Sequence, residues 1–278
     1  MKIVFIGGGN MANALIGGLI KQGFSRAKIA VVEPNDAART KLDAAFDVVC
    51  HANAASAVPG SEVVVLAVKP QVMRAVATDL APLLFGQLVI SIAAGTRMVD
   101  LARWLGAVGD GANAPHTRMV RAMPNTPALV GLGITGLTAH AGVSAADRDA
   151  ANRILAAVGE TVWVADESLL DPVTAVSGSG PAYVFYFLEA MVRAGGELGL
   201  SEAAARQLAV QTFAGAAELA RQSPETLATL RANVTSKGGT TEAALKSMDA
   251  SGVGAAITKA VHAASARGRE MGDLMRKA

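Results

Sequence analysis

A glycine-rich turn late in the chain has residue types that suit a small anionic substrate. It lies in NVTSKGGTTEAAL, residues 233–245, where two glycines precede a helical pattern that opens with threonines. Free N–H groups at a helix start bind anions, so such a turn would suit a substrate carboxylate. The Thr241 hydroxyl both donates and accepts hydrogen bonds, which suits contact with a substrate nitrogen. A helix capped by threonine, with no ligand, explains the same residues.

The first glycine-rich turn has the spacing of a dinucleotide loop. Residues 6–20, IGGGNMANALIGGLI, contain G-x-G-x-x-A at Gly7, Gly9 and Ala12, after an apolar run and before a helical one. Gly7 permits a tight turn, Gly9 lets the backbone approach a pyrophosphate, and Ala12 lets the helix pack on the strand. The flanking pattern favours dinucleotide binding over a purely structural turn.

An acid, Glu33, follows the second apolar run and suits a hydrogen bond from a ribose 2′-hydroxyl. That contact favours NADH, because a carboxylate repels the 2′-phosphate of NADPH. Arg39 and Lys41 would weaken the repulsion, and a solvated strand end explains Glu33 equally well. The choice between NADH and NADPH therefore stays open.

The residues favour reduction of an imine over reduction of a carbonyl. Carbonyl reduction builds an alkoxide and needs a positioned acid such as His or Lys. Reduction of a protonated imine turns a cation into a neutral amine, so it needs a carboxylate anchor more than a strong acid. We expect surface or loop positions for the histidines, which have no paired acid nearby: His51, His116, His140 and His262.

Short apolar runs alternate with amphipathic stretches through residues 2–165. This alternation predicts an α/β, Rossmann-type doubly wound sheet. Buried parallel strands are expected at 2–7, 27–33, 47–50, 62–68 and 87–93, and further strands at 117–123, 133–139 and 160–165. A helix is expected over 144–159, with Ser144 as its N-cap.

Ala-rich helical patterns follow residue 166 and predict an all-α second part. We expect a dinucleotide-binding Rossmann domain over 1–165 and a helical dimerisation and substrate-binding domain over 166–278. Helix starts are expected at Ser201, at Ser223 followed by Pro224, and at Thr240 or Thr241. The segment from 181 is apolar on nearly every face, which predicts an interface between two chains; a central core helix would show the same pattern.

The composition is that of a globular protein: 278 residues, 51% hydrophobic and 17% charged. A net charge of +2 gives no reason to expect nucleic acid or membrane as a partner. The single cysteine, Cys50, forms no internal disulfide, and MKIVFIGGG at the start lacks the pattern of an export signal. We expect a cytoplasmic protein without a metal ion.

Six motifs, taken together, resemble those of pyrroline-5-carboxylate reductases, the enzyme family that catalyses the last step of proline biosynthesis. In order they are IGGGNMA, LAVKPQ (66–71), SIAAG (91–95), RAMPNTPA (121–128), AVSGSGPAY (175–183) and NVTSKGGTTEAAL. The resemblance covers essentially the whole chain, and the last two motifs are specific to the family. It implies reduction of 1-pyrroline-5-carboxylate to L-proline by NADPH or NADH, through hydride transfer to the ring C=N. It also implies a homodimer at least, with the active site in a cleft between the domains at the dimer interface.

The resemblance also implies the site residues. For the cofactor they are Gly7, Gly8, Gly9, Asn10, Met11 and Ala12 at the phosphates, Asn35 and Asn53 near the adenosine, and Ala67, Val68, Lys69, Pro70, Ala93, Ala94 and Gly95 near the nicotinamide. For the substrate they are Glu167, Asn233, Val234, Ser236, Gly239, Thr240 and Thr241, with Thr241 matching the residue that hydrogen-bonds the substrate nitrogen.

The chain departs from the family pattern at one position of this turn. Lys237 stands where the family usually has proline, which makes the turn less rigid and adds positive charge near a carboxylate. The two effects leave the sign of the change in substrate affinity open. A loop extension away from the chemistry is expected at GDGANAPH, residues 109–116.

Two other classes of function stay open at this point. A β-hydroxyacid dehydrogenase has a similar fold, but Val184 stands where that family has its catalytic lysine. A regulatory protein that senses dinucleotides needs only the first domain, and NADH binding without oxidation would reveal it. A helical assembly module would not need the nucleotide loop.

Overall fold

The computed structural model describes residues 1–106 and 115–277, which form two compact units. The first unit contains the chain up to Ser179 together with the chain from Ala264 onward, and the second contains Gly180–Ala263. Residues 109–114 of the expected loop extension lie outside the described residues.

The first unit is built on an eight-stranded sheet with the order β3-β2-β1-β4-β5-β6-β7-β8. Neighbouring strands are parallel except for the antiparallel pair β6 and β7. The strands are β1 Ile3–Ile6, β2 Ile29–Val32, β3 Val49–His51, β4 Val63–Leu66, β5 Leu88–Ser91, β6 Met119–Met123, β7 Gly133–Ala139 and β8 Gly159–Trp163. All eight expected strands are confirmed.

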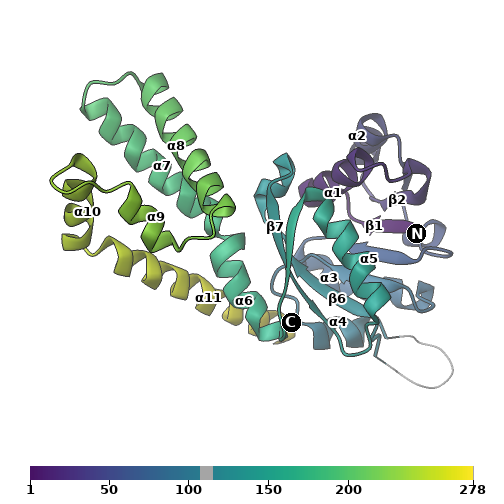
Figure 1. The fold of residues 1–278 in the computed structure, drawn as a ribbon. Helices are drawn as coiled ribbons and strands as arrows, with labels where there is room; N and C mark the ends of the chain where they lie inside the picture. The colour runs from purple at the N-terminus through teal and green to yellow at the C-terminus, as the bar shows by residue number, and fades with distance from the viewer. Residues whose placement is uncertain (107–114, 278) are drawn as a thin grey trace. The chain divides into compact units, whose positions relative to one another are not determined.

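Helices cover both faces of this sheet (Figure 1) because successive strand residues point to opposite sides. Ile3 and Phe5 pack in one apolar cluster with α1 (Asn10–Lys21), α2 (Asp36–Phe46) and α5 (Ala145–Leu155). Val4 and Ile6 pack in the other with α3 (Met73–Leu80) and α4 (Met98–Trp104). This two-sided burial explains why β1, β2 and β4 are apolar throughout and why β5 is apolar up to Ser91.

Helix α5 starts where its sequence predicts. The Ser144 side chain accepts a hydrogen bond from the backbone N–H of Asp147, and the Asp147 carboxylate accepts one from Ser144 N–H, which completes a capping box. Arg118 also pairs with Asp147, at 2.6 Å. Ser144 is therefore confirmed as the N-cap.

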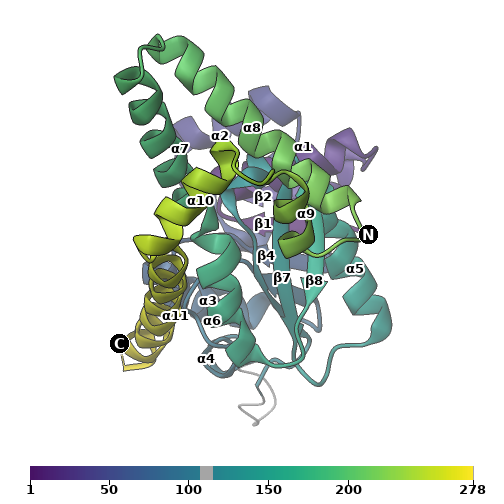
Figure 2. The same cartoon turned by 60° about the vertical axis from the view of Figure 1, so that its left-hand side comes forward.

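The second unit is helical. Helices α7 (Gly180–Glu197) and α8 (Glu202–Gln222) lie side by side in both views (Figure 2), with Phe187 and Phe213 rings 6.5 Å apart. Then come α9 (Leu227–Asn233), α10 (Thr240–Ala250) and α11 (Val253–Lys277), whose last residues belong to the first unit. Ser201 caps α8 as predicted, by accepting from Ala204 N–H.

One expected helix start is wrong. Ser223 is the C-cap of α8 in an extended conformation, and α9 begins at Leu227 with Thr226 as its N-cap. Pro224 disfavours a helical conformation for the residue before it, so the chain makes a turn there before the next helix. Thr226 then accepts from the N–H of Thr229 at 3.2 Å.

Helix α7 buries none of its residues within this chain. Phe185 is 60% exposed and Tyr186 73%, although both are large and aromatic. A central core helix would bury them, so the exposed face fits the interface between two chains that the sequence predicts. No helix in the described part of the chain is long and apolar enough to cross a membrane.

The compact units divide after Ser179, later than the boundary expected at 165. The reason is that α6 (Leu170–Val173) packs on β6 and β7: Leu170 is buried, and a side chain at Gly136 would meet Val173. Near the C-terminus, Gly272 lies against Arg97, so the end of α11 also belongs to the sheet unit. The functions assigned to the two expected domains stay predictions.

Candidate active site

The segments predicted to bind a cofactor leave the sheet at one edge. Ile6 pairs in register with Val32 on one side and with Leu66 on the other, and Leu66 pairs with Ser91. The residues that follow these four strands therefore emerge together at the carboxyl edge. In a doubly wound sheet this edge binds ligands.

The first glycine loop, residues 7–12, uses its glycines for different reasons. Gly7 has φ +99°, and a side chain there would come within 2.9 Å of the carbonyl oxygen of Ala67. A side chain at Gly8 would collide with Leu42. Gly9 has an ordinary φ of −73° and no heavy atom within 4 Å of the place where its Cβ would lie. The described chain gives no reason for glycine there, whereas a ligand lying against the backbone does.

The start of α1 is open to an anion. Gly9 is the N-cap and supplies no side-chain cap, and the first turn carries no acidic residue. The leading N–H groups of α1 are thus available to a phosphate, which the helix dipole also favours. Ala12, 1% exposed, lets the helix pack closely on the sheet. These residues fit the diphosphate of a dinucleotide.

Glu33 lies directly on this loop. Its Oε2 accepts a hydrogen bond from Gly8 N–H at 3.1 Å, and its Oε1 accepts one from Asn35 N–H at 3.0 Å. Arg39 donates to the carbonyl oxygens of Glu33 and Pro34 and pairs with Asp36, so protein groups already engage its guanidinium. Negative charge therefore lies beside the loop, and the contact of Glu33 with a ribose stays a prediction.

The two asparagines predicted near the adenosine serve as caps. The Asn35 side chain accepts from Ala38 N–H at 2.9 Å, at the start of α2. The Asn53 side chain accepts from the Ser56 N–H and hydroxyl at 3.3 and 3.1 Å, in the loop after β3. Both residues follow strands at the carboxyl edge of the sheet.

The residues predicted near the nicotinamide follow β4 and β5. Ala67 N–H donates to Ile6 O at 2.8 Å, and exposed Lys69 is the N-cap of the short helical turn that begins with Pro70. Gly95 has φ +77°, which favours glycine, and Ala93 is buried. The next residue, Thr96, is buried, and its Oγ1 has no hydrogen-bond partner in the described chain.

Glu167 lies in the first unit and is held by two groups. Its Oε1 accepts from the N–H of Met98, the first residue of α4, at 2.6 Å, and it forms an ion pair with Arg121. Burial lowers the pKa of Arg121, while the nearby Glu167 carboxylate opposes that change. Sequence reasoning missed Arg121, although a charged residue inside an apolar strand pattern is a signal of a buried partner.

A second ion pair involves Asp171, four residues after Glu167. Arg97, the residue before α4, binds Asp171 at 3.0 Å. Together with the Met98–Glu167 hydrogen bond, this pair ties the segment after Gly95 to residues 167 and 171. Nothing in the sequence pattern indicated Arg97 or Asp171.

The remaining substrate residues lie in the second unit, around the late glycine turn, which we define as residues 236–241. Gly238 has φ +74°, Gly239 is the N-cap of α10, and no side chain caps this helix. Thr241 is half-buried in the first turn and its hydroxyl makes no hydrogen bond to another described residue. Asn233 ends α9 and donates to Glu225 at 3.0 Å, and Val234 follows it, exposed. Within this unit the structure brings together the predicted substrate residues other than Glu167.

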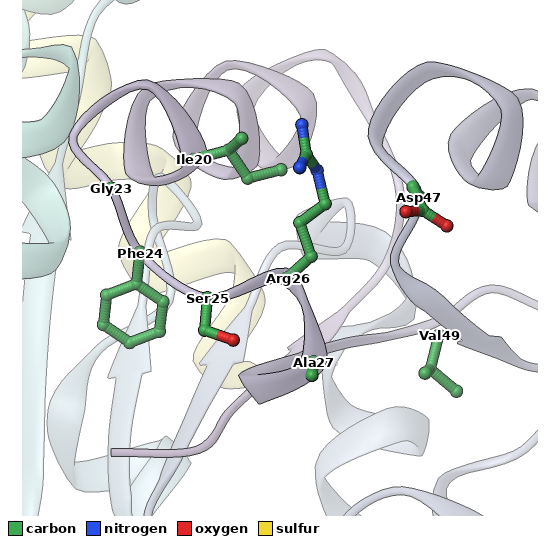
Figure 3. Close-up of a pocket in the computed structure, with 8 residues that line it drawn as sticks. All are labelled: Ile20, Gly23, Phe24, Ser25, Arg26, Ala27, Asp47 and Val49. Carbon is green, nitrogen blue, oxygen red and sulfur yellow. The ribbon is translucent and has the colours of Figure 1, made fainter.

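A cavity of about 670 Å³ lies elsewhere, between the end of α1 and the loops that lead into β2 and β3 (Figure 3). Arg26 and Asp47 line it together with apolar side chains, and none of the predicted site residues does. It lies at the amino ends of the strands, away from the first glycine loop. No group of three or more His, Cys, Asp or Glu residues in the described chain is placed to hold a metal ion.

Comparison with known proteins decides the family. Residues 167–271 match the family described as pyrroline-5-carboxylate reductase dimerisation, and residues 2–95 match the family described as NADP oxidoreductase, coenzyme F420-dependent. The chain is 48% identical over 273 residues to pyrroline-5-carboxylate reductase of Pseudomonas aeruginosa, covering 98% of this chain and 97% of the relative. This chain belongs to the pyrroline-5-carboxylate reductase family.

Solved structures of the family have the same fold. A pyrroline-5-carboxylate reductase from Coxiella burnetii superposes with a TM-score of 0.90 at 37% identity, over 97% of this chain and 98% of that one. The Plasmodium falciparum pyrroline carboxylate reductase, solved with NADP bound, gives a TM-score of 0.84 at 28% identity, with 98% of each chain covered. The expected fold class, a Rossmann-type sheet followed by a helical dimerisation region, is confirmed.

Proposed function

We propose that this chain reduces 1-pyrroline-5-carboxylate to L-proline with NADPH or NADH, the last step of proline biosynthesis. The observation that carries the proposal is the uncapped start of α10, which lies within the matched dimerisation region and offers N–H groups to a carboxylate. The full-length similarity to a named reductase supports the same reaction. An NAD(P)H-dependent oxidoreductase fits both family matches.

The cofactor is assigned to the carboxyl edge of the sheet. The first glycine loop would hold the diphosphate, Asn35 and Asn53 would lie toward the adenosine, and the segments 67–70 and 93–95 would lie toward the nicotinamide. When bound, the reduced nicotinamide supplies a hydride. The fit depends on the free N–H groups of α1 and on Gly9, which no neighbouring group restricts.

The substrate is assigned to the late glycine turn. The N–H groups of Thr240 and Thr241 would bind its carboxylate, with Ser236 and Gly239 shaping the turn and Asn233 and Val234 beside it. The Thr241 hydroxyl would hold the ring nitrogen, so that the C=N carbon gains the hydride and the protonated nitrogen becomes a neutral amine. Because no anion develops, positioning suffices and no strong acid is required. We also propose that Glu167 lines this site as an acidic residue.

The dimerisation match supports a homodimer. We propose the exposed aromatic face of α7 as part of its interface; an assembly of dimers stays a prediction, as does the absence of nucleic-acid and membrane partners. We also predict that the start of α1 and the start of α10 face one shared crevice. A crystal containing both an inert cofactor and L-proline would test it.

The test of the reaction is a comparison of rates with NADH and with NADPH. We expect the purified protein to oxidise one or both in the presence of 1-pyrroline-5-carboxylate, forming one L-proline for each cofactor oxidised. A protein that oxidises the cofactor with keto acids but not with the cyclic imine would contradict the proposal. Binding of NADH without oxidation by any of these compounds would indicate a dinucleotide sensor.

A further inference from the structure

The Glu242 carboxylate is held by one group within the late glycine turn and by one group beyond it. Its Oε2 accepts a hydrogen bond from Gly238 N–H at 2.7 Å, and its Oε1 lies 3.2 Å from Lys246 Nζ, one helical turn further on. The side chain is 31% exposed. One carboxylate thus links the turn to the first two turns of α10.

The position of this contact leaves the helix start free. An acid at the third helical residue commonly bonds the N–H of the N-cap residue. Here the N-cap is Gly239, whose N–H donates to Ser236 O at 3.0 Å, and Glu242 bonds the preceding residue, Gly238. The carboxylate therefore bonds Gly238 N–H and makes no hydrogen bond to the N–H groups of Thr240 and Thr241 among the described contacts.

The same contacts offset the charge of Glu242. A free carboxylate beside an anion site would repel a substrate carboxylate, but this one is bound by an N–H group and by the Lys246 ammonium. Gly238, at φ +74°, is a residue with wide conformational freedom, so a bond to its N–H restricts the part of the turn that moves most easily.

We propose that Glu242 is a positioning residue that holds the late glycine turn in the conformation that binds the substrate carboxylate. The inference rests on the proposed function, because it concerns the same substrate site. Glu242 acts through Gly238 and touches neither substrate nor cofactor. Its loss weakens substrate binding while the hydride-transfer step and cofactor binding stay as they are.

The test is steady-state kinetics of Glu242→Ala and Glu242→Gln with 1-pyrroline-5-carboxylate. We expect Glu242→Ala to raise the KM for the substrate about tenfold, as loss of one charge-assisted hydrogen bond would. The KM for the cofactor and kcat should change less than about twofold, because the hydride-transfer site is untouched. Glu242→Gln keeps one oxygen that accepts from Gly238 N–H, so its KM should lie within about threefold of the unsubstituted enzyme.

The matched control is Glu218→Ala, which removes another carboxylate of the second unit that is paired with a cation three residues along a helix. Its KM should not change. An unchanged or lower substrate KM in Glu242→Ala would overturn the inference. A loss of kcat and of cofactor affinity as large as the change in substrate KM would overturn it as well. If Glu242→Ala does not fold, Glu242→Asp decides: its carboxylate is one methylene too short, and a normal KM would overturn the inference.

The two proposals fail in different ways. The proposed function is refuted if the unsubstituted enzyme does not turn over the cyclic imine. Normal turnover, with a KM that does not respond to substitution of Glu242, refutes only the positioning role.

Discussion

Residues at the starts of α1 and α10 fall into two kinds. Some are required by the fold itself, and others have no role within the chain and are explained by a ligand. Gly7 and Gly8 are required by the chain itself, because side chains there would approach Ala67 or Leu42 too closely. Gly9 faces open space with an ordinary φ, and Thr241 carries a hydroxyl that no described residue bonds. Residues of the second kind are those that substitution should affect in activity more than in stability.

Glu33 is expected to discriminate between the two cofactors. Replacing it by Gln removes the charge beside Gly8 N–H, and we expect the ratio of kcat/KM for NADPH to that for NADH to rise about tenfold or more. The measurement is kcat/KM with each cofactor at saturating substrate. Asp43→Asn removes one charge from the exposed side of α2 and should leave the ratio unchanged. An unaltered ratio in Glu33→Gln would mean that Glu33 does not face the ribose.

Thr241 is expected to act on the substrate alone. Thr241→Ala should lower kcat by about ten- to a hundredfold, because one hydrogen bond to the ring nitrogen is lost, while the Kd for NADPH stays the same. Thr241→Ser restores a hydroxyl and should recover most of the rate. If the alanine variant turns over normally, Thr241 has no part in the reaction, although the carboxylate site could still stand.

At the scale of elements, the ion pairs of the first unit join segments that are far apart in sequence. Glu167 bonds the first N–H of α4 and pairs with Arg121 of β6, and Arg97 before α4 pairs with Asp171. These contacts fix the segment after β5, which we assign to the nicotinamide. Removing one partner of either pair would leave the other charge without its partner, so each pair favours the arrangement in which both partners meet.

The start of α5 gives a prediction for pH dependence. Hydrogen bonds from Arg118, and then from Ser144, lower the pKa of Asp147 from 3.8 to about 2. Because the folded state lowers this pKa, the stabilisation is present above about pH 4 and is lost as the pH falls toward 2. We expect Asp147→Asn to reduce the free energy of unfolding by about 1–2 kcal/mol at neutral pH.

Denaturant unfolding at neutral pH and near pH 3 checks this expectation. The difference between Asp147→Asn and the unsubstituted protein should shrink as the pH falls, whereas exposed Asp149→Asn on the same helix should make little difference at either pH. A difference that is the same at both pH values would show that the charge of Asp147 does not matter.

For the molecule as a whole, we expect dimer formation to depend on α7. Phe185→Asp places a charge on its exposed aromatic face, and a charge buried in an interface costs several kcal/mol. The variant should therefore be monomeric by analytical ultracentrifugation at concentrations where the unsubstituted protein is dimeric. Phe85→Asp, at an 82% exposed position of the first unit, is the control and should remain dimeric. A dimeric Phe185→Asp would place the interface elsewhere.

Local sequence patterns were sufficient to predict the strands and most helix starts, although the start expected at Ser223 was wrong. Alternating apolar runs predicted all eight strands, Ser144 and Ser201 predicted two caps, and the spacing of Gly7, Gly9 and Ala12 predicted the loop at the start of α1. Each of these signals acts over a few residues, through backbone conformation, capping or the period of burial, so a local pattern is sufficient to read it.

Contacts between groups that are far apart in the chain could not be predicted from any local pattern. The bond from Gly8 to Glu33, the pairing of Glu167 with Arg121, and the packing of α6 on the sheet unit depend on how separate elements lie against one another. We predicted Glu33 from its place after a strand and Glu167 from the family resemblance, but neither signal indicated the backbone N–H groups that bond these two carboxylates. A side chain's partner across the fold is set by the packing of non-local elements, and no pattern within one segment contains that information.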